Sequence, residues 1–290
     1  MILRLGSNIF DLIFSDSNRK KIERVTIWTA TIGFIVHLTL VIINNNSFLS
    51  FSIDNSLLSS PISAIYTPFS IILYYEIFLL IFYLPRSFTT SILKQFEIIS
   101  LILIRRVFYD IPKLDLNTSN WFDSSNNLQL TYDIVTILIL FFLIYLFSLV
   151  KSSIKIKKAK KNFNSFIDSK KIISIGLVPV MVILFIYSFY QLNLSEINSY
   201  YISSFYFVNE VFYSTFFSIL IIADVFILLI SFMHTERYSQ IMRNTGFIIC
   251  TILIRLSFSS SGITNLLLIV SSVTFGLLIL KIYSLMNKIE

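Results

Sequence analysis

Four charged side chains stand inside long apolar stretches of this sequence. Glu76 lies within the run YYEIFLLIFYLP, and Asp224 opens a similar run, DVFILLI. Arg105 and Arg255 stand in two further runs, SLILIRRVF and CTILIRLSF. In the hydrocarbon core of a bilayer a charge costs about 2.5–3.5 kcal/mol on insertion scales unless a partner compensates it. Residues of this kind bind ions or protons, or they pair with one another.

The spacing of these charges predicts two ion pairs. Each charge lies nine to eleven residues from the helix end on one side of the membrane, about 14 to 16 Å deep at the helical rise. We therefore expect Glu76 to pair with Arg105, and Asp224 with Arg255, because a guanidinium can hold a carboxylate through two parallel hydrogen bonds. Such pairs fix helix neighbours in a structural role or belong to an ion or substrate pathway. The sequence leaves both interpretations open.

Three further polar residues join the pathway candidates. Glu97 and Arg106 have no charged counterpart in the second half of the chain, and Arg106 can instead extend toward the membrane surface. Glu97 and Arg105 are eight residues apart and share roughly one helix face. His37 fits a satisfied polar group in the bundle better than a proton relay. The full set of candidates is Glu76, Glu97, Arg105, Arg106, Asp224, Arg255 and His37.

Catalytic and cofactor chemistry finds little support in the sequence. The chain has two histidines, far apart and with no acid at a metal-ligand spacing, which argues against a metal site. It contains no zinc spacing, P-loop, dinucleotide fingerprint or nucleophile elbow, so we expect no cofactor and no catalytic residue. The single cysteine, Cys250, excludes an internal disulfide. An intramembrane enzyme is the least supported function class.

The composition predicts an all-α polytopic membrane protein. Of the 290 residues 56% are hydrophobic and only 13% are charged, against about 25% charged in a soluble domain. Six segments are long and apolar enough to span a bilayer: about 25–44, 62–84, 131–150, 172–192, 209–233 and 264–285. Two weaker segments, about 92–110 and 245–260, each carry arginine.

The distribution of lysine predicts eight spans with both termini in the cytoplasm. Residues 151–171 hold eight lysines and one acid, so the positive-inside rule makes this linker cytoplasmic, like the basic N-terminal segment. An even number of spans must separate the two, which requires the segment at 92–110 to cross. The same parity makes the segment at 245–260 cross. We expect a multi-pass protein of the cytoplasmic (inner) membrane.

The two halves of the chain also share the order of their charges. EIFLLIF at 76–82 matches DVFILLI at 224–230, and the two arginine runs follow at an offset of 150 residues. The sequence thus predicts two parallel four-helix units, 25–150 and 172–290, joined by the linker 151–171. Residues 1–24 are expected to form an amphipathic interfacial helix. Its apolar face would hold Leu5, Ile9, Leu12 and Ile13, with the basic residues 19–24 closing it.

These patterns favour a channel or transporter for a small ion or solute. The alternative is a non-catalytic anchor or scaffold subunit of a membrane complex, and a homo-oligomer or complex partner stays open. Lysine and arginine cluster at the ends of apolar runs, which favours the lipid bilayer over nucleic acid as the partner of a chain with net charge +7. The residues expected at anionic headgroups are Lys151, Lys155, Lys157, Lys158, Lys160 and Lys161.

Overall fold

The described part of the chain is helical and contains no strand. The structure is a computed structural model that describes residues 2–45, 61–111, 114–115, 120–154, 163–195, 204–235 and 237–289. Its helices are α1 (Ile2–Ile13), α2 (Asp16–Asn45), η2 (Pro61–Ile65), α3 (Tyr66–Tyr83), α4 (Phe88–Asp110), η4 (Trp121–Asp123), α5 (Ser125–Ser153), α6 (Phe163–Ser195), α7 (Ser204–His234), α8 (Tyr238–Ser257) and α9 (Gly262–Ile289). The predicted all-α class is confirmed.

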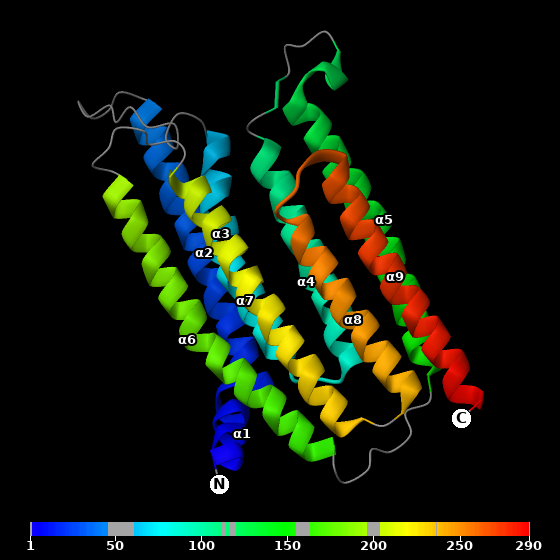
Figure 1. The fold of residues 1–290 in the computed structure, drawn as a ribbon. Helices are drawn as coiled ribbons and strands as arrows, with labels where there is room; N and C mark the ends of the chain where they lie inside the picture. The colour runs from blue at the N-terminus through cyan, green and yellow to red at the C-terminus, as the bar shows by residue number, and fades with distance from the viewer. Residues whose placement is uncertain are drawn as a thin grey trace.

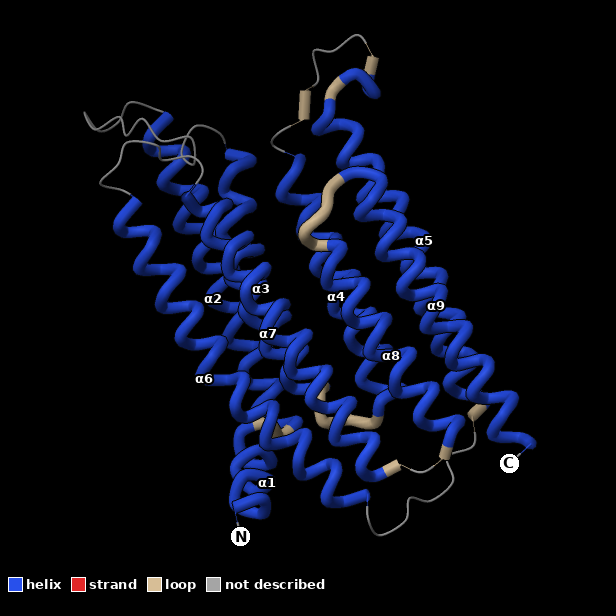
Figure 2. Tube along the Cα trace, viewed as in Figure 1, coloured by secondary structure: helices blue, strands red, loops and turns tan. Residues whose placement is uncertain are grey.

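Six of these helices are long and apolar enough to cross a membrane, which indicates a multi-pass membrane protein. They include Asp16–Asn45, Pro61–Tyr83, Ser125–Ser153, Phe166–Tyr187, Thr215–His234 and Gly262–Lys288. These are the six segments that hydrophobicity singled out in the sequence. Figure 1 shows α2 to α9 running up and down one bundle, with both chain termini at the same end. Figure 2 shows tan loops only at the ends of that bundle.

The two arginine-bearing helices, α4 and α8, contact each other near the middle of the bundle (Figure 1). α4 also packs against α3 and α5, and α8 packs against α7 and α9. Phenylalanine rings fill this contact: Phe147 of α5 lies 5.5 Å from Phe96 of α4 and 6.0 Å from Phe247 of α8, measured between centroids. The core therefore sits where the two halves of the chain meet.

Short turns deliver the charged helices to this core. α3 ends just before Pro85, and the side chain of Ser87 accepts a hydrogen bond from the backbone N–H of Thr90, at 3.3 Å, to cap α4. The turn after α8 passes through Gly262, whose φ of 62° favours glycine. Consecutive antiparallel helices result, so α3 places Glu76 beside α4, and α7 places Asp224 beside α8.

Two glycines bring α9 close to α8 and α4. A Cβ at Gly246 of α8 would lie 2.8 Å from Ile279 of α9, and one at Gly276 would lie 3.1 Å from the Cys250 sulfur. Ser272 of α9 donates a 2.7 Å hydrogen bond to the carbonyl of Cys250. Small residues permit such close approach between apolar helices. This packing holds α8, and with it Arg255, in a fixed position.

The N-terminal segment differs from the sequence prediction in its boundary. α1 ends at Ile13 and α2 begins at Asp16, so the basic residues 19–24 belong to α2 and do not close the first helix. Phe14 stacks on Phe78 of α3 with centroids 5.4 Å apart, and Asp11 forms a 2.7 Å ion pair with Lys171 of α6. These contacts dock α1 on the bundle, while the predicted apolar face at Ile9, Leu12 and Ile13 stays exposed. The side chain of Leu5 lies outside the described residues.

The lysine-rich linker is shorter in the structure than in the sequence prediction. α5 continues through Ser153 and α6 begins at Phe163, so helices take up both ends of residues 151–171. Lys151 lies half-buried in the last turn of α5. The other lysines expected at lipid headgroups, Lys155, Lys157, Lys158, Lys160 and Lys161, lie outside the described residues.

Candidate functional site

Asp224 of α7 and Arg255 of α8 form a fully buried ion pair. Arg255 Nη1 lies 2.6 Å from Asp224 Oδ2, and their side chains are 1% and 2% exposed. The other terminal nitrogen of Arg255 donates a 3.0 Å hydrogen bond to Gln95 Oε1 of α4. The predicted pair is confirmed, but its geometry differs from two parallel bonds. The guanidinium is shared between two halves of the chain instead of closing on one carboxylate.

Glu76 of α3 and Arg105 of α4 form the second predicted pair. Arg105 Nε lies 3.5 Å from Glu76 Oε2, which is beyond the usual length of an N–H···O hydrogen bond. The glutamate side chain is 3% exposed, and the arginine is 13% exposed. The pairing is confirmed, and it is looser than the contact between Asp224 and Arg255.

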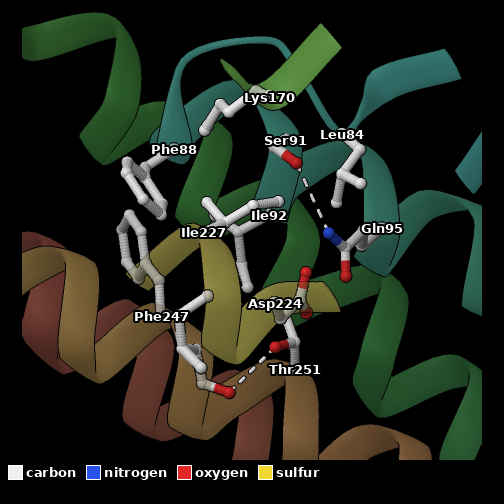
Figure 3. A pocket seen from close by; sticks show the side chains of 11 residues that line it. Leu84, Phe88, Ser91, Ile92, Gln95, Lys170, Asp224, Ile227, Phe247 and Thr251 are labelled. Carbon is white, nitrogen blue, oxygen red and sulfur yellow. Dashed lines mark hydrogen bonds between the residues drawn. The ribbon is translucent and has the colours of Figure 1, made fainter. Parts of the chain in front are cut away.

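A water-sized cavity lies beside Asp224, between α4, α6, α7 and α8. Its volume is about 20 Å³, which is room for one water molecule. Figure 3 shows Gln95 and Asp224 near each other in this lining, with Lys170 at the opposite side from Thr251. Gln95 donates a long 3.4 Å hydrogen bond to Ser91. Apolar side chains therefore form much of the lining of the cavity, and several polar groups lie among them.

Lys170 is a buried cation that the sequence placed in the exposed linker. It is 2% exposed, and its Nζ donates a 3.0 Å hydrogen bond to the backbone carbonyl of Arg86. The same Nζ lies 4.0 Å from the centroid of the Phe88 ring and 5.1 Å from that of Phe166. Aromatic faces attract a cation in this geometry. Phe166 lies one helical turn before Lys170. This apolar residue was the available signal that α6 packs against the bundle at this level.

Arg106 finds a partner that sequence reasoning missed. Its Nε donates a 2.7 Å hydrogen bond to Asp133 Oδ2 of α5, and its Nη2 contacts the other carboxylate oxygen. Nη2 also donates a 2.9 Å hydrogen bond to Asn265 of α9, and Gln129 donates a 3.0 Å bond to Asp133. This pair has the two-point geometry expected of the other two. The two predicted pairs leave Arg106 without an acid. This excess arginine was the available signal that Arg106 needs a further acid as its partner.

The remaining two candidates lie apart from the central pairs. Glu97 forms a 2.5 Å ion pair with Lys94 one turn earlier on α4, and its side chain is 38% exposed. His37 Nδ1 lies 2.6 Å from Thr67 Oγ1 of α3, so the interpretation of a satisfied polar group is confirmed. Within the described ranges no cluster of three His, Cys, Asp or Glu side chains is able to hold a metal ion.

The comparisons with known proteins supply no relative to guide the interpretation. No family model, no curated protein and no solved structure matches this chain.

Proposed function

We propose that the chain crosses the membrane eight times, with both termini in the cytoplasm of a cell bounded by an inner membrane. The length of α4 and α8, 23 and 20 residues, supports this, because it corresponds to about 35 and 30 Å of helix against a hydrocarbon core of about 30 Å. The acids paired with Arg105, Arg106 and Arg255 supply the compensation that spanning requires.

The proposal includes two parallel four-helix units, residues 25–150 and 172–290. Its support is that corresponding helices meet: α4 contacts α8, and α5 contacts α9, as a two-fold axis along the bundle would require. The small contact of α3 with α6 has no counterpart of the same size between α7 and α2 in the described ranges. The two units are thus not fully equivalent.

The proposed activity of this bundle is passage of a small ion, as a channel or transporter. The observation that carries it is the charge around the cavity beside Asp224: Arg255 pairs with this carboxylate, and Lys170, a second buried cation, lines the same cavity. A structural ion pair needs one partner, and a second cation adds desolvation energy without a matching acid. A carboxylate that shares a water-sized cavity with a second cation is a group whose partner can be exchanged for a transported ion.

The size of the cavity sets which ion fits in this conformation. A volume of about 20 Å³ holds one water or a proton carried on it, and it excludes a hydrated metal ion. In the proposed cycle Asp224 and Glu76 bind the ion when their arginines release them. Arg255 then rests on Gln95 and keeps a polar partner during the exchange. Passage of a larger ion would need the four helices around the cavity to separate.

The alternative proposal is a non-catalytic anchor or scaffold subunit. The observation that favours it is that both central carboxylates are almost fully buried, as permanent structural pairs would be. Such a protein would keep these pairs closed and act through a partner.

A flux assay on the unmodified chain distinguishes the two proposals. Purified protein is placed in liposomes, and the movement of protons, Na⁺, K⁺ and Cl⁻ is followed with ion-sensitive dyes. Transport predicts flux of one ion above that of protein-free liposomes. Absence of flux for all four ions, together with co-purification of a stoichiometric partner, would make the scaffold the correct function.

A further inference from the structure

A row of exposed side chains winds across the outward side of α2. It takes every fourth residue from Lys20 to Leu40, and residues spaced by four adjoin one another with a turn of about 40° at each step. In order these residues are Lys20, Arg24, Trp28, Ile32, Val36 and Leu40. The last four are 51–63% exposed. We call this series the α2 ridge.

A groove lies at the basic end of the α2 ridge. It has a volume of about 460 Å³ and is lined by Arg19, Lys20, Glu23, Arg24, Ile27 and Trp28. The acid in this lining is already engaged: Glu23 lies 3.5 Å from Arg19 and accepts a 3.1 Å hydrogen bond from Tyr75. In the described ranges no ion pair includes Lys20 or Arg24. The groove therefore presents two cations to an incoming group.

The order of chemistry along the α2 ridge matches that of a phospholipid. Two cations come first, an indole follows one turn deeper, and aliphatic side chains continue for about 18 Å from Trp28 to Leu40. A leaflet of hydrocarbon is about 15 Å deep, and indoles favour the headgroup level. We propose that the α2 ridge binds an anionic phospholipid, with its phosphate at Lys20 and Arg24 and its acyl chains along Ile32, Val36 and Leu40.

The position of the ridge decides between a lipid and other phosphate compounds. The aliphatic part lies on a helix apolar enough to span the bilayer, so the occupant must extend into hydrocarbon. A free phosphate would use only the groove and leave the deeper side chains without a role. Zwitterionic lipids have the same acyl chains, so the two cations supply the preference for an anionic headgroup.

Lipid retention tests this inference without relying on transport. The full-length protein is purified in mixed micelles containing phosphatidylglycerol or phosphatidylcholine, and bound lipid is counted by native mass spectrometry. The double variant Lys20→Gln, Arg24→Gln should lower the affinity for phosphatidylglycerol by about 30-fold, since each basic residue contributes roughly 1 kcal/mol at an anionic surface. Its affinity for phosphatidylcholine should not change.

The matched control removes two charges away from the ridge. The variant Lys281→Gln, Lys288→Gln alters two exposed lysines of α9, and it should retain phosphatidylglycerol. The melting temperature of each variant establishes that it is folded. Equal binding of the two lipids by the unmodified protein would overturn the inference, as would equal loss in both double variants. Full competition by inorganic phosphate would reassign the groove to a free anion.

Discussion

Among single residues, three cations that lie between the helices are held in three different ways. Arg106 closes on both oxygens of Asp133, while Arg255 divides its nitrogens between Asp224 and Gln95. Lys170 rests on a carbonyl and two aromatic rings. A guanidinium is a planar fork that serves two acceptors, whereas an ammonium is a compact point charge. The two arginines therefore connect helices, and Lys170 adds charge to a cavity.

The fork of Arg255 makes Arg255→Lys a test of the link between the two halves of the chain. A lysine can keep the contact with Asp224 but cannot also reach Gln95 in the same geometry. We expect the free energy of unfolding to fall by about 1–3 kcal/mol, the range for leaving a buried polar group unsatisfied. Unfolding by sodium dodecyl sulfate in mixed micelles measures it. The exposed Arg237→Lys is the control, and equal stabilities of the two variants would contradict the bridging role.

The two-point pair of Arg106 with Asp133 predicts strong non-additivity. Arg106→Met leaves the buried Asp133 carboxylate without its arginine and should cost about 3–5 kcal/mol of unfolding free energy. Asp133→Leu leaves Arg106, which is 24% exposed, and should cost less. The double variant removes both charges and should cost much less than the sum. A double-mutant cycle in the same unfolding assay gives the coupling energy. Additive effects would show that the two side chains do not interact.

Removing the charge of Lys170 should change the unfolding free energy in the opposite direction from removing an arginine. Lys170→Met keeps a flexible apolar side chain against Phe88 and Phe166 and removes a desolvated cation. We expect the unfolding free energy to stay level or rise by about 1–4 kcal/mol, as for other buried ions replaced by apolar groups. Lys171→Met, which breaks the pair with Asp11, is the control expected to lower stability or leave it unchanged. A loss of several kcal/mol at Lys170 would instead identify a structural role.

At the scale of elements, the position of α8 depends on glycine packing against α9. Gly246→Ala places a Cβ 2.8 Å from Ile279, so a neighbour must move, and overpacking of this kind costs about 1–3 kcal/mol. Gly176→Ala is the matched control because no atom lies within 4 Å of its Cβ. There the greater helix propensity of alanine should raise stability by up to about 1 kcal/mol. The unfolding assay distinguishes the loss of stability expected for Gly246→Ala from the gain expected for Gly176→Ala. Similar effects at both sites would exclude close contact between α8 and α9.

The sequence reveals most of these helices but not all contacts of the site. Apolar length predicts six of them, and depth counted along consecutive antiparallel helices predicts the pairs of Glu76 and Asp224. Gln95 of α4 bonds Arg255 across the two halves of the chain, and Lys170 of α6 shares a cavity with Asp224. No spacing rule encodes such contacts. Asp133 was missed because it lies near the start of its segment, where an acid needs no partner. The break between α1 and α2 fell inside a polar stretch with no change in apolar pattern.

At the scale of the whole molecule, the proposed eight spans depend on whether α4 and α8 cross. Cysteine labelling in a background where Ser replaces the buried Cys250 decides this. Cysteines at Arg86 and Arg237 should react with a membrane-impermeant maleimide only after the membrane is opened. Cysteines at Asp123 and Ser261 should react in intact cells, because one span separates each from the first pair. Equal labelling at Arg86 and Asp123, and likewise at Arg237 and Ser261, would mean that neither α4 nor α8 crosses and would leave a six-span protein.

If the buried carboxylates of this bundle bind a transported ion, flux through single-site variants must depend on them. Asp224→Asn and Glu76→Gln keep the shape of each side chain and remove its charge. For Glu97→Gln, which alters a half-exposed local pair on α4, we predict unchanged flux in liposomes. For Asp224→Asn and Glu76→Gln we predict a fall of roughly tenfold or more, equivalent to about 1.4 kcal/mol. Each variant leaves an arginine without its carboxylate and lowers the melting temperature, so flux is measured below that temperature, where the variant is folded. Unchanged flux in folded Asp224→Asn and Glu76→Gln would contradict the account.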